Sequence, residues 1–344
     1  MTIQVTKEPI NLREKLNELE TNKGLKGNEI LQAETAQEVR SLIGAGRKNL
    51  IINGGMDVWQ RGTSQTGVVD SAYQTVDRFK GRRSTVTADI TKGTSTLPDN
   101  SKVNTFKITA TSSATGFMGL SQAFEQSVFD YIDNRTVTLS CWIKTNRTDI
   151  TFRHSSIGNF SVGSYNADGT WQKISGTYTV PAGSTSMQFD ILTFANSTSA
   201  HTIGDYFEIA NVQLELGSVA TDFEYRSYGE ELALCQRFYQ RLNVTHSGAI
   251  ARGQVWNTTS GYVNFPLSQP LRAYPTALTF NNLSVWGSAG TGTTGTLTLS
   301  IHTGSTKDTV RLNVGGKTNL GGAGQVCSVY GTTATSWLAL EAEL

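Results

Sequence analysis

Charge is scarce in this chain of 344 residues: 17% of them are charged, where about 25% is usual for a soluble domain. The 29 basic and 28 acidic side chains nearly cancel, and a net charge of +1 argues against nucleic acid or an anionic membrane as the partner of the whole chain. Three widely spaced cysteines suggest no disulfide framework. No apolar run approaches the ~20 residues of a membrane span, and the N-terminus lacks the apolar segment of a secretory signal. We therefore expect no nucleic-acid partner and no membrane insertion.

Threonine, serine, asparagine and 34 glycines take the place of the missing charge. Exposed strand faces accept Thr and Ser readily, so this composition is typical of β-rich secreted, fibrous and virion proteins. With 38% hydrophobic residues, the chain can still bury sizeable cores. Its length suits two domains and a small extra segment. The patterns below divide it into residues 1–47, 48–228 and 229–344.

Residues 1–47 have the spacing of two short helices. Leucines at 4-3 spacing within residues 11–20 form a coiled-coil seam, but one shorter than a stable coiled coil needs. A second helix is predicted at residues 35–43, where Thr35 and Glu38 have capping-box spacing. Neither helix carries enough apolar surface to stand alone. We expect this segment to attach or oligomerise the protein; a plain helical linker is the alternative.

Residues 48–228 switch to a period of two, which predicts an antiparallel β-sandwich of jelly-roll type. Residues 49–62 predict its first strand and turn, with Trp59 and Arg61 as packing and pairing partners at its base. One later strand places four apolar residues on one face: Val137, Leu139, Cys141 and Ile143. A parity change at residues 210–211 predicts a β-bulge. Turn signals follow the strands at residues 97–100, 166–169 and 181–183.

Residues 229–344 predict a connecting helix and a distal β-domain. The helix is expected over residues 230–240, where apolar residues recur every four positions. Residues 297–301 alternate and are answered by residues 310–314 across a polar turn, which predicts a hairpin. Residues 289–295 form a glycine-rich loop, and residues 337–344 predict a final strand that runs to the last residue.

Several motifs in this order resemble the central and distal parts of bacteriophage tail-fibre and tail-tip proteins. The first is residues 49–62, Asn-Leu-Ile-Ile-Asn-Gly-Gly-Met-Asp-Val-Trp-Gln-Arg-Gly. It is followed by Tyr-Gln-Thr-Val-Asp-Arg-Phe at 73–79, Val-Gln-Leu-Glu-Leu-Gly at 212–217, Thr-Asp-Phe-Glu-Tyr-Arg at 221–226 and Glu-Leu-Ala-Leu-Cys-Gln-Arg-Phe-Tyr at 231–239. The helix at residues 35–44 and the closing strand are also similar to segments of such fibres.

The resemblance implies a structural virion protein of the tail, usually a homotrimer. Residues 1–47 would bind other tail or baseplate proteins. The sandwich, similar to carbohydrate-binding modules, would stiffen the stalk, and the distal domain would bind a host-surface glycan or another envelope component. The chain is short for a fibre, and residues 248–334 match no known motif. Two other readings therefore stay open: an architectural adaptor or head or neck fibre without receptor binding, and a polysaccharide-degrading tailspike.

Catalytic patterns are sparse, and we expect no enzyme. Polysaccharide cleavage usually needs two neighbouring carboxylates, yet Asp308 is the only acidic residue between Glu231 and Glu341. The four histidines show no metal-ligand spacing, and no nucleophile or phosphate-loop motif is present. No cofactor is expected. A structural calcium in the sandwich would have three carboxylates in suitable places: Asp57, Asp205 and Glu208.

Candidate ligand-binding residues lie in the distal domain. Sugar rings stack on aromatic side chains, and basic side chains attract acidic glycans. The candidates are Trp256, Tyr262, Trp286, Tyr330, Arg252 and Arg272. Residues 232–340 carry seven cations and one Asp, but scattered solubilising charge and pairing of Arg237 and Arg241 with acidic groups would also explain this bias. The aromatics also fit a core or a trimer interface. In the sandwich, Trp142 has the parity opposite to the apolar face of its strand, so it is expected to face a second layer or to lie exposed as a binding platform.

Overall fold

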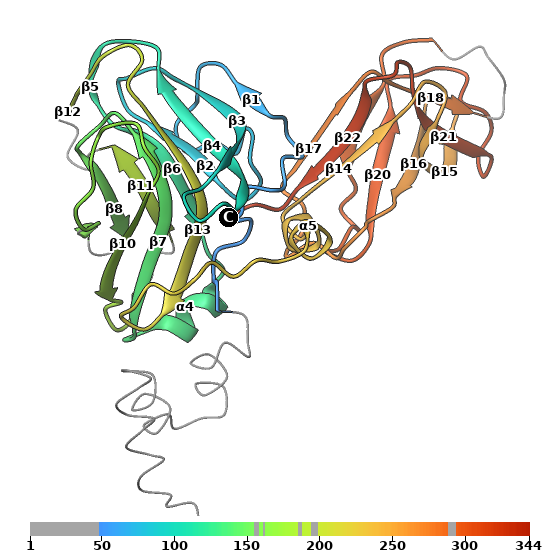
Figure 1. Ribbon diagram of the computed structural model, residues 1–344. Coiled ribbons are helices and arrows are strands. Elements are labelled where there is room, and N and C mark those ends of the chain that lie inside the picture. The colour runs from blue at the N-terminus through green and yellow to red at the C-terminus, as the bar shows by residue number, and fades with distance from the viewer. Residues whose placement is uncertain (1–47, 155–157, 161, 185–187, 194–198, 288–293) are drawn as a thin grey trace, which may run out of the picture. The chain divides into compact units, whose positions relative to one another are not determined.

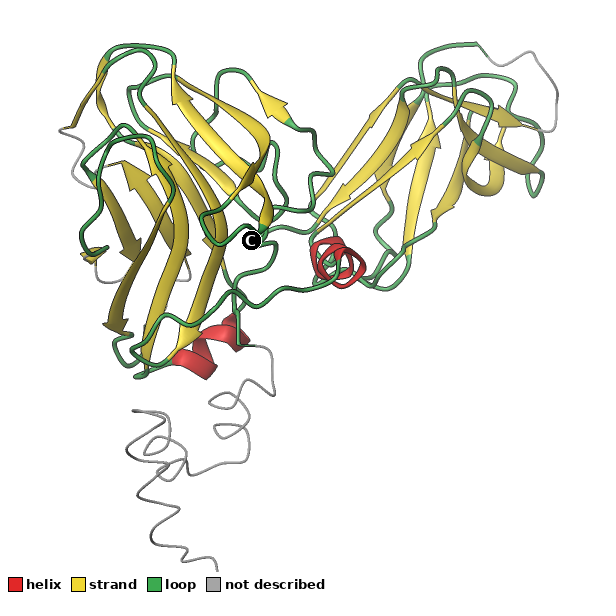
Figure 2. Ribbon diagram, viewed as in Figure 1, coloured by secondary structure: helices red, strands yellow, loops and turns green. Residues whose placement is uncertain are grey.

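The computed structural model describes residues 48–154, 158–160, 162–184, 188–193, 199–287 and 294–344. The chain forms two compact units, residues 1–50 and 51–344. The two predicted N-terminal helices, and most of the glycine-rich loop at 289–295, lie outside the described residues. The mainly β fold is confirmed, with strands from β1 to β22 and two helices within the described part of the chain (Figures 1 and 2). None of the helices described there is long and apolar enough to cross a membrane.

The predicted antiparallel sandwich spans residues 64–216 of the second unit. One sheet, here called the sandwich sheet, has the order β1-β3-β4-β13-β7-β10. Its strands are β1 Ser64–Gln65, β3 Ala88–Thr96, β4 Lys102–Ala110, β13 Tyr206–Leu216, β7 Thr136–Thr145 and β10 Gln172–Thr179. The other sheet has the order β2-β6-β11-β8-β9, with β2 Lys80–Arg83, β6 Met118–Ala123, β11 Gln188–Thr193, β8 Ile150–His154 and β9 Gly158–Phe160. A short pair joins β5 Ala114–Gly116 to β12 Ser199–His201, and helix α4 spans Gln126–Ile132.

Alternating side chains build the core of the sandwich, because successive residues of a strand point to opposite faces. In β7 the four residues expected on one face are each at most 1% exposed. The prediction that Cys141 is a small buried side chain is thus confirmed. The predicted turns at residues 97–100 and 181–183 are present, whereas the predicted turn at 166–169 is only a bend at residues 168–169. The register of β13 against β7 shifts between Ala210 and Gln213, which confirms the predicted bulge.

The opening stretch, residues 49–62, is not the first strand, and that prediction is wrong. Residues 52–55 form turns instead, and Asn53 adopts a left-handed φ of 63°. Its amide nitrogen donates to the carbonyls of Val58 and Asp77 (2.8 and 3.0 Å), while its amide oxygen accepts from two backbone N–H groups. These bonds replace the ladder of a strand, so the stretch folds as a buried, hydrogen-bonded loop.

A buried ionic cluster follows this loop and confirms the expectation that Arg61 is a pairing partner. Arg61 contacts Asp77 and Glu343 (3.3 and 3.1 Å), and Arg78 forms a second ion pair with Glu343. All four side chains are at most 7% exposed. Burial raises the pKa of Asp77 to about 7, against the opposing effect of Arg61. Trp59 packs as expected, with its ring 6.5 Å from that of Phe106.

The connecting helix, α5, spans Tyr228–Gln236 and is shorter than predicted. Ser227 and Glu230 form a capping box that fixes its start. The predicted last turn is wrong, because residues 239–244 pair with β22 as strand β14. Apolar spacing of four is compatible with both structures over so short a stretch, and the tertiary pairing decides between them.

The distal strands form two antiparallel sheets around one apolar core. The first has the order β14-β22-β17, with β14 Tyr239–Val244, β22 Ser336–Glu341 and β17 Ala277–Asn281. The second, here called the distal sheet, has the order β18-β21-β15-β16-β20-β19. Its strands are β18 Leu283–Gly287, β21 Val326–Gly331, β15 Ala249–Asn257, β16 Ser260–Phe265, β20 Val310–Gly315 and β19 Thr298–Ile301. The predicted hairpin is confirmed, since Leu299 pairs with Val314. The final strand is confirmed too, although it ends at Glu341 rather than at the last residue.

Candidate functional site

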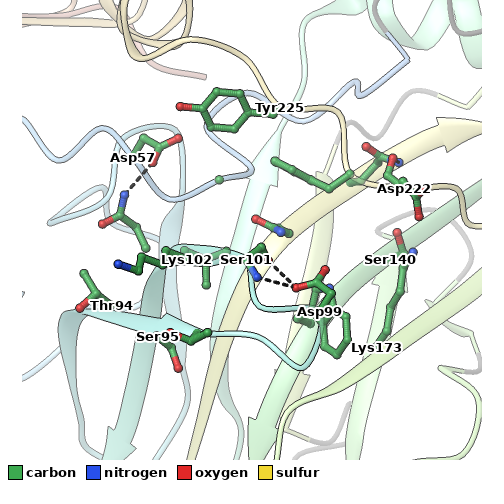
Figure 3. Close-up of a pocket in the computed structure, with 18 of the residues that line it drawn as sticks. Asp57, Thr94, Ser95, Asp99, Ser101, Lys102, Ser140, Lys173, Asp222 and Tyr225 are labelled. Atoms are coloured by element: carbon green, nitrogen blue, oxygen red, sulfur yellow. Dashed lines mark hydrogen bonds between the residues drawn. The ribbon is translucent and has the colours of Figure 1, made fainter.

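A groove of about 1270 Å³ lies along the outer side of the sandwich sheet (Figure 3). Its lining combines three aromatic rings with many hydroxyl and amide groups and charges of both signs. The lining residues are Gly55, Asp57, Thr94, Ser95, Thr96, Asp99, Ser101, Lys102, Val103, Asn104, Ser140, Trp142, Lys173, Asn211, Gln213, Thr221, Asp222, Phe223 and Tyr225.

The floor of the groove comes from side chains that alternate away from the sandwich core. Trp142 of β7 pairs with Lys173 of β10 on one side and with Ala210 of β13 on the other. The bulge then inserts one extra residue into β13, and Asn211 adopts a left-handed φ of 53° there. Trp142 therefore faces away from the sandwich core and is partly exposed in the groove, and the bulge brings Asn211 into the lining beside it.

One wall is the end of the hairpin made by β3 and β4. The indole nitrogen of Trp171, just before β10, donates to Ser95 Oγ of β3 across a gap of 2.8 Å. The two strands are at nearly opposite edges of the sandwich sheet, so the sheet must curl to allow this bond. In Figure 3, Thr94 and Ser95 lie on the side opposite Tyr225 and Asp57. The curled sheet is what hollows the groove.

The second wall is the segment that follows β13, residues 221–225. Outward side chains of the sandwich sheet bind the backbone of this segment. Gln213 accepts from the Glu224 N–H (2.8 Å) and donates to the Asp222 carbonyl (3.2 Å). The Lys173 ammonium donates to the Thr221 carbonyl (2.9 Å). Tyr225 is 76% exposed on this fixed backbone, which makes it a ring presented to solvent rather than a core side chain.

Asp99 and Asp57 of the groove both accept hydrogen bonds from neighbouring polar groups. The Ser101 hydroxyl and N–H both donate to Asp99 (2.6 and 2.9 Å), and these hydrogen bonds lower the pKa of Asp99 below its usual range. An ionised Asp99 accepts hydrogen bonds, whereas a glycosidic general acid needs a raised pKa. Asp57 accepts from the Asn104 amide (2.6 Å). The arrangement suits the hydroxyl groups of a sugar.

The three carboxylates considered for calcium do not form one site. Asp205 pairs with Arg147 (2.6 Å), Glu208 accepts from the Thr105 hydroxyl (2.6 Å), and Asp57 belongs to the groove. Over the residues that the structure describes, no group of three or more His, Cys, Asp or Glu is placed to hold a metal ion. A structural calcium therefore does not fit these residues.

Five of the six residues predicted to bind ligand lie on strands of the distal sheet and share its outer side. Trp256 and Trp286 are 45% and 46% exposed, Arg252 is exposed, and Tyr262 and Tyr330 are partly so. Tyr262, Trp286 and Tyr330 each lie between two buried residues of their strand, and in β15 the buried Ala251 and Val255 precede Arg252 and Trp256, as alternation requires. The rings of Trp256 and Tyr262 are 5.8 Å apart.

Arg272 does not join them, and its prediction is corrected. Its guanidinium donates to the backbone carbonyls of Ala342 and Glu343 (2.7 and 3.2 Å). It therefore holds the chain after β22 in place and is not presented to a ligand. The sequence predicts the sandwich as a stiffener of the stalk and does not predict the groove. The signals that pointed to it were the outward parity of Trp142 and the bulge beside it.

Comparisons with known proteins return no matching family model and no matching curated protein. Among solved structures, the chain is similar to the CBM22-1 xylan-binding domain from Paenibacillus barcinonensis, with 16% identity and a TM-score of 0.27 over 46% of this chain and 94% of that one. It is also similar to a domain of tailspike protein 4 of bacteriophage CBA120, with 18% identity and a TM-score of 0.29 over 49% of this chain and 21% of that one.

A third similar structure is the family 11 carbohydrate-binding module of a cellulosomal cellulase of Clostridium thermocellum, with 14% identity and a TM-score of 0.26 over 46% of this chain and 97% of that one. Identities and TM-scores this low assign neither a ligand nor a family to this chain. Its function must be argued from its own residues.

Proposed function

We propose that this protein is a bacteriophage tail-fibre or receptor-binding protein whose sandwich groove holds an uncharged polysaccharide of the host surface. The groove carries the proposal: it offers an outward indole on its floor, an exposed phenol on its wall, and hydroxyl and amide groups between them. Sugars present apolar C–H faces that stack on such rings and hydroxyls that bond to such polar groups. Lysines and carboxylates both line the groove, so no single charge is favoured in its ligand.

The virion part of the proposal is supported by the ordered motifs of the sequence. It includes a homotrimer, a location in the phage tail, and attachment to other tail or baseplate proteins through residues 1–47. Native mass measurement of the full chain tests the trimer directly, and a stable monomer would contradict it.

Binding without cleavage is also part of the proposal. It is supported by the lowered pKa of Asp99, which makes this groove carboxylate a poor proton donor. Incubation with bound polysaccharide should release no reducing ends. Release of reducing ends would instead favour the tailspike reading.

The experiment that tests the groove is binding of the full chain to an array of uncharged bacterial polysaccharides. Trp142→Ala should weaken binding about 10- to 30-fold, as loss of a central aromatic contact does. Trp256→Ala is the matched control, because it removes a second exposed indole outside the groove. Equal loss in both variants, or no binding by the wild-type protein, would overturn the groove as the site.

A further inference from the structure

The outer side of the distal sheet presents a continuous row of side chains across five strands. Strand pairing sets Trp286 of β18 opposite Ser328 of β21, and Ser328 opposite Arg252 of β15. Arg252 in turn pairs with Asn264 of β16, which pairs with Arg311 of β20. Neighbouring strands lie about 4.8 Å apart, so the row extends about 19 Å. Such a row is long enough to contact several sugar rings. We name these five residues, with Tyr262, the distal sheet face.

Of the seven cations between Glu231 and Glu341, two lie on this face and two others form ion pairs with carboxylates. Arg237 forms an ion pair with Glu125, which lies outside the connecting helix where an acidic partner was expected, and Lys307 pairs with Asp308. Arg272 donates to backbone carbonyls, and Arg241 to Asn243 and the Gln60 carbonyl. Lys317 lies in the loop after β20. Arg252 and Arg311 are the two cations of the distal sheet face.

No carboxylate balances these two guanidinium groups within the described strands. Asp308 is the sole acidic residue between Glu231 and Glu341, and it lies in the turn between β19 and β20 beside Lys307. The face is therefore complementary in charge to an anion. Arginine suits this role because its planar fork binds carboxylate and phosphate groups in a bidentate way.

Aromatic rings stand beside the two arginines. Trp286 begins the row, and the Arg311 guanidinium lies over the Tyr262 ring, 4.3 Å from its centroid. The Tyr262 hydroxyl donates to Gln254 (2.9 Å), which fixes the ring on the sheet. Ser328 lies between Trp286 and Arg252, and Asn264 lies between Arg252 and Arg311, so the face is amphipathic rather than a continuous apolar patch. This mixture favours a saccharide over an apolar protein partner.

We propose that the distal sheet face is a second binding surface, specific for an anionic polysaccharide that carries phosphate or carboxylate groups. Trp286 and Tyr262 stack on sugar rings, and Arg252 and Arg311 bind the acidic groups between them. This surface is separate from the sandwich groove in both position and ligand charge, so it goes beyond the function proposed above.

The test measures binding of the full chain to poly(glycerol phosphate) and to polygalacturonate by biolayer interferometry. The double variant Arg252→Gln with Arg311→Gln should weaken binding to both polymers about tenfold. Raising the salt concentration should also weaken binding of both polymers by the wild-type protein, because screened charges attract each other less. Lys307→Gln is the matched control: it removes one positive charge from the same region but outside the face, and binding should stay within about twofold.

Three results would overturn the proposal. The first is absence of wild-type binding to both polymers. The second is an equal loss in the control, which would indicate a diffuse field instead of a site. The third is a change in the native mass of the arginine variant, which would make the face an interface between copies of this chain. Thermal unfolding of each variant separates loss of contacts from loss of fold. The array of uncharged polysaccharides reports on the groove independently, so either proposal can fail without the other.

Discussion

The sandwich sheet and the distal sheet have the same number of strands and the same alternation, yet their outer sides differ in shape and in charge. The sandwich sheet curls until Trp171 reaches Ser95, and a bulge in β13 adds a residue to its floor, so its outer side is a groove with charges of both signs. The outer side of the distal sheet carries a row of aromatic, polar and cationic side chains. The difference teaches that long-range contacts shape the surface, while alternation alone selects which side chains reach it.

The largest expected effect concerns the buried ionic cluster that links the opening loop to the chain after β22. Glu343→Ala leaves Arg78 buried without this carboxylate and removes one of the partners of Arg61. The free energy of unfolding should fall by about 3–5 kcal/mol, measured by denaturant titration. Asp308→Asn is the control, because it breaks an ion pair whose side chains are 56% exposed and should cost less than about 1 kcal/mol. Similar losses in both variants would mean that the cluster is not an important link.

A pH effect should arise in the sandwich, where His154 is buried among Phe129, Tyr178 and Phe189. Burial lowers the pKa of His154 to about 4 from 6.5. The folded protein therefore binds fewer protons than the unfolded chain, and this contribution to stability is complete above pH 6.5 and is lost as the pH falls toward 4. Through this group alone, the free energy of unfolding should fall by about 3 kcal/mol as the pH falls from 6.5 to 4.

His154→Phe isolates this effect from other titrating groups such as Asp77. Its unfolding free energy should fall less than that of the wild-type protein between pH 6.5 and 4, while anionic polymer binding at neutral pH should be unchanged. An identical pH dependence in both proteins would show that His154 is not buried in its neutral form.

A smaller effect is expected when the tryptophan of each surface is substituted, Trp142 in the sandwich groove and Trp286 on the distal sheet face. Trp142→Ala should weaken binding of uncharged polysaccharide by about 1.4–2 kcal/mol, while Trp286→Ala should weaken only the anionic polymers. Isothermal titration calorimetry of both variants with both ligand classes measures whether each substitution weakens binding of only one class. If both variants lose both ligands to the same extent, the two faces do not differ in specificity.

The smallest effect separates two arginines that the sequence grouped together. Arg272→Gln should lower the free energy of unfolding by about 1 kcal/mol, because its hydrogen bonds to two carbonyls are lost. It should leave anionic polymer binding unchanged, in contrast to Arg252→Gln. A loss of binding in Arg272→Gln with no loss of stability would return Arg272 to the binding surface.

Local patterns were enough to predict much of the fold. Alternation predicted the buried face of β7, the hairpin of residues 297–301 with residues 310–314, and the bulge at residues 210–211, because each depends on parity within a few residues. Arg252 lies on the outer side of β15 and Arg272 lies in a loop, but the sequence grouped the two arginines together.

Long-range bonds explain what local patterns missed. The apolar run at residues 50–52 suggested a strand, but the Asn53 side chain bonds to the carbonyl of Asp77 and fixes a loop. The groove was missed for the same reason, because its walls depend on bonds such as that from Trp171 to Ser95, which are 76 residues apart. Residues that far apart leave no periodic signal in a sequence.

Indole resonances of the full chain, followed by nuclear magnetic resonance during titration with each ligand class, test the central claim most directly. The chain has six tryptophans, so each indole N–H can be assigned by substitution. An uncharged polysaccharide that binds should shift the indole signal of Trp142 and leave that of Trp286 in place, and poly(glycerol phosphate) should do the reverse. Movement of the same indole with both ligands, or of neither, would contradict two surfaces of different specificity.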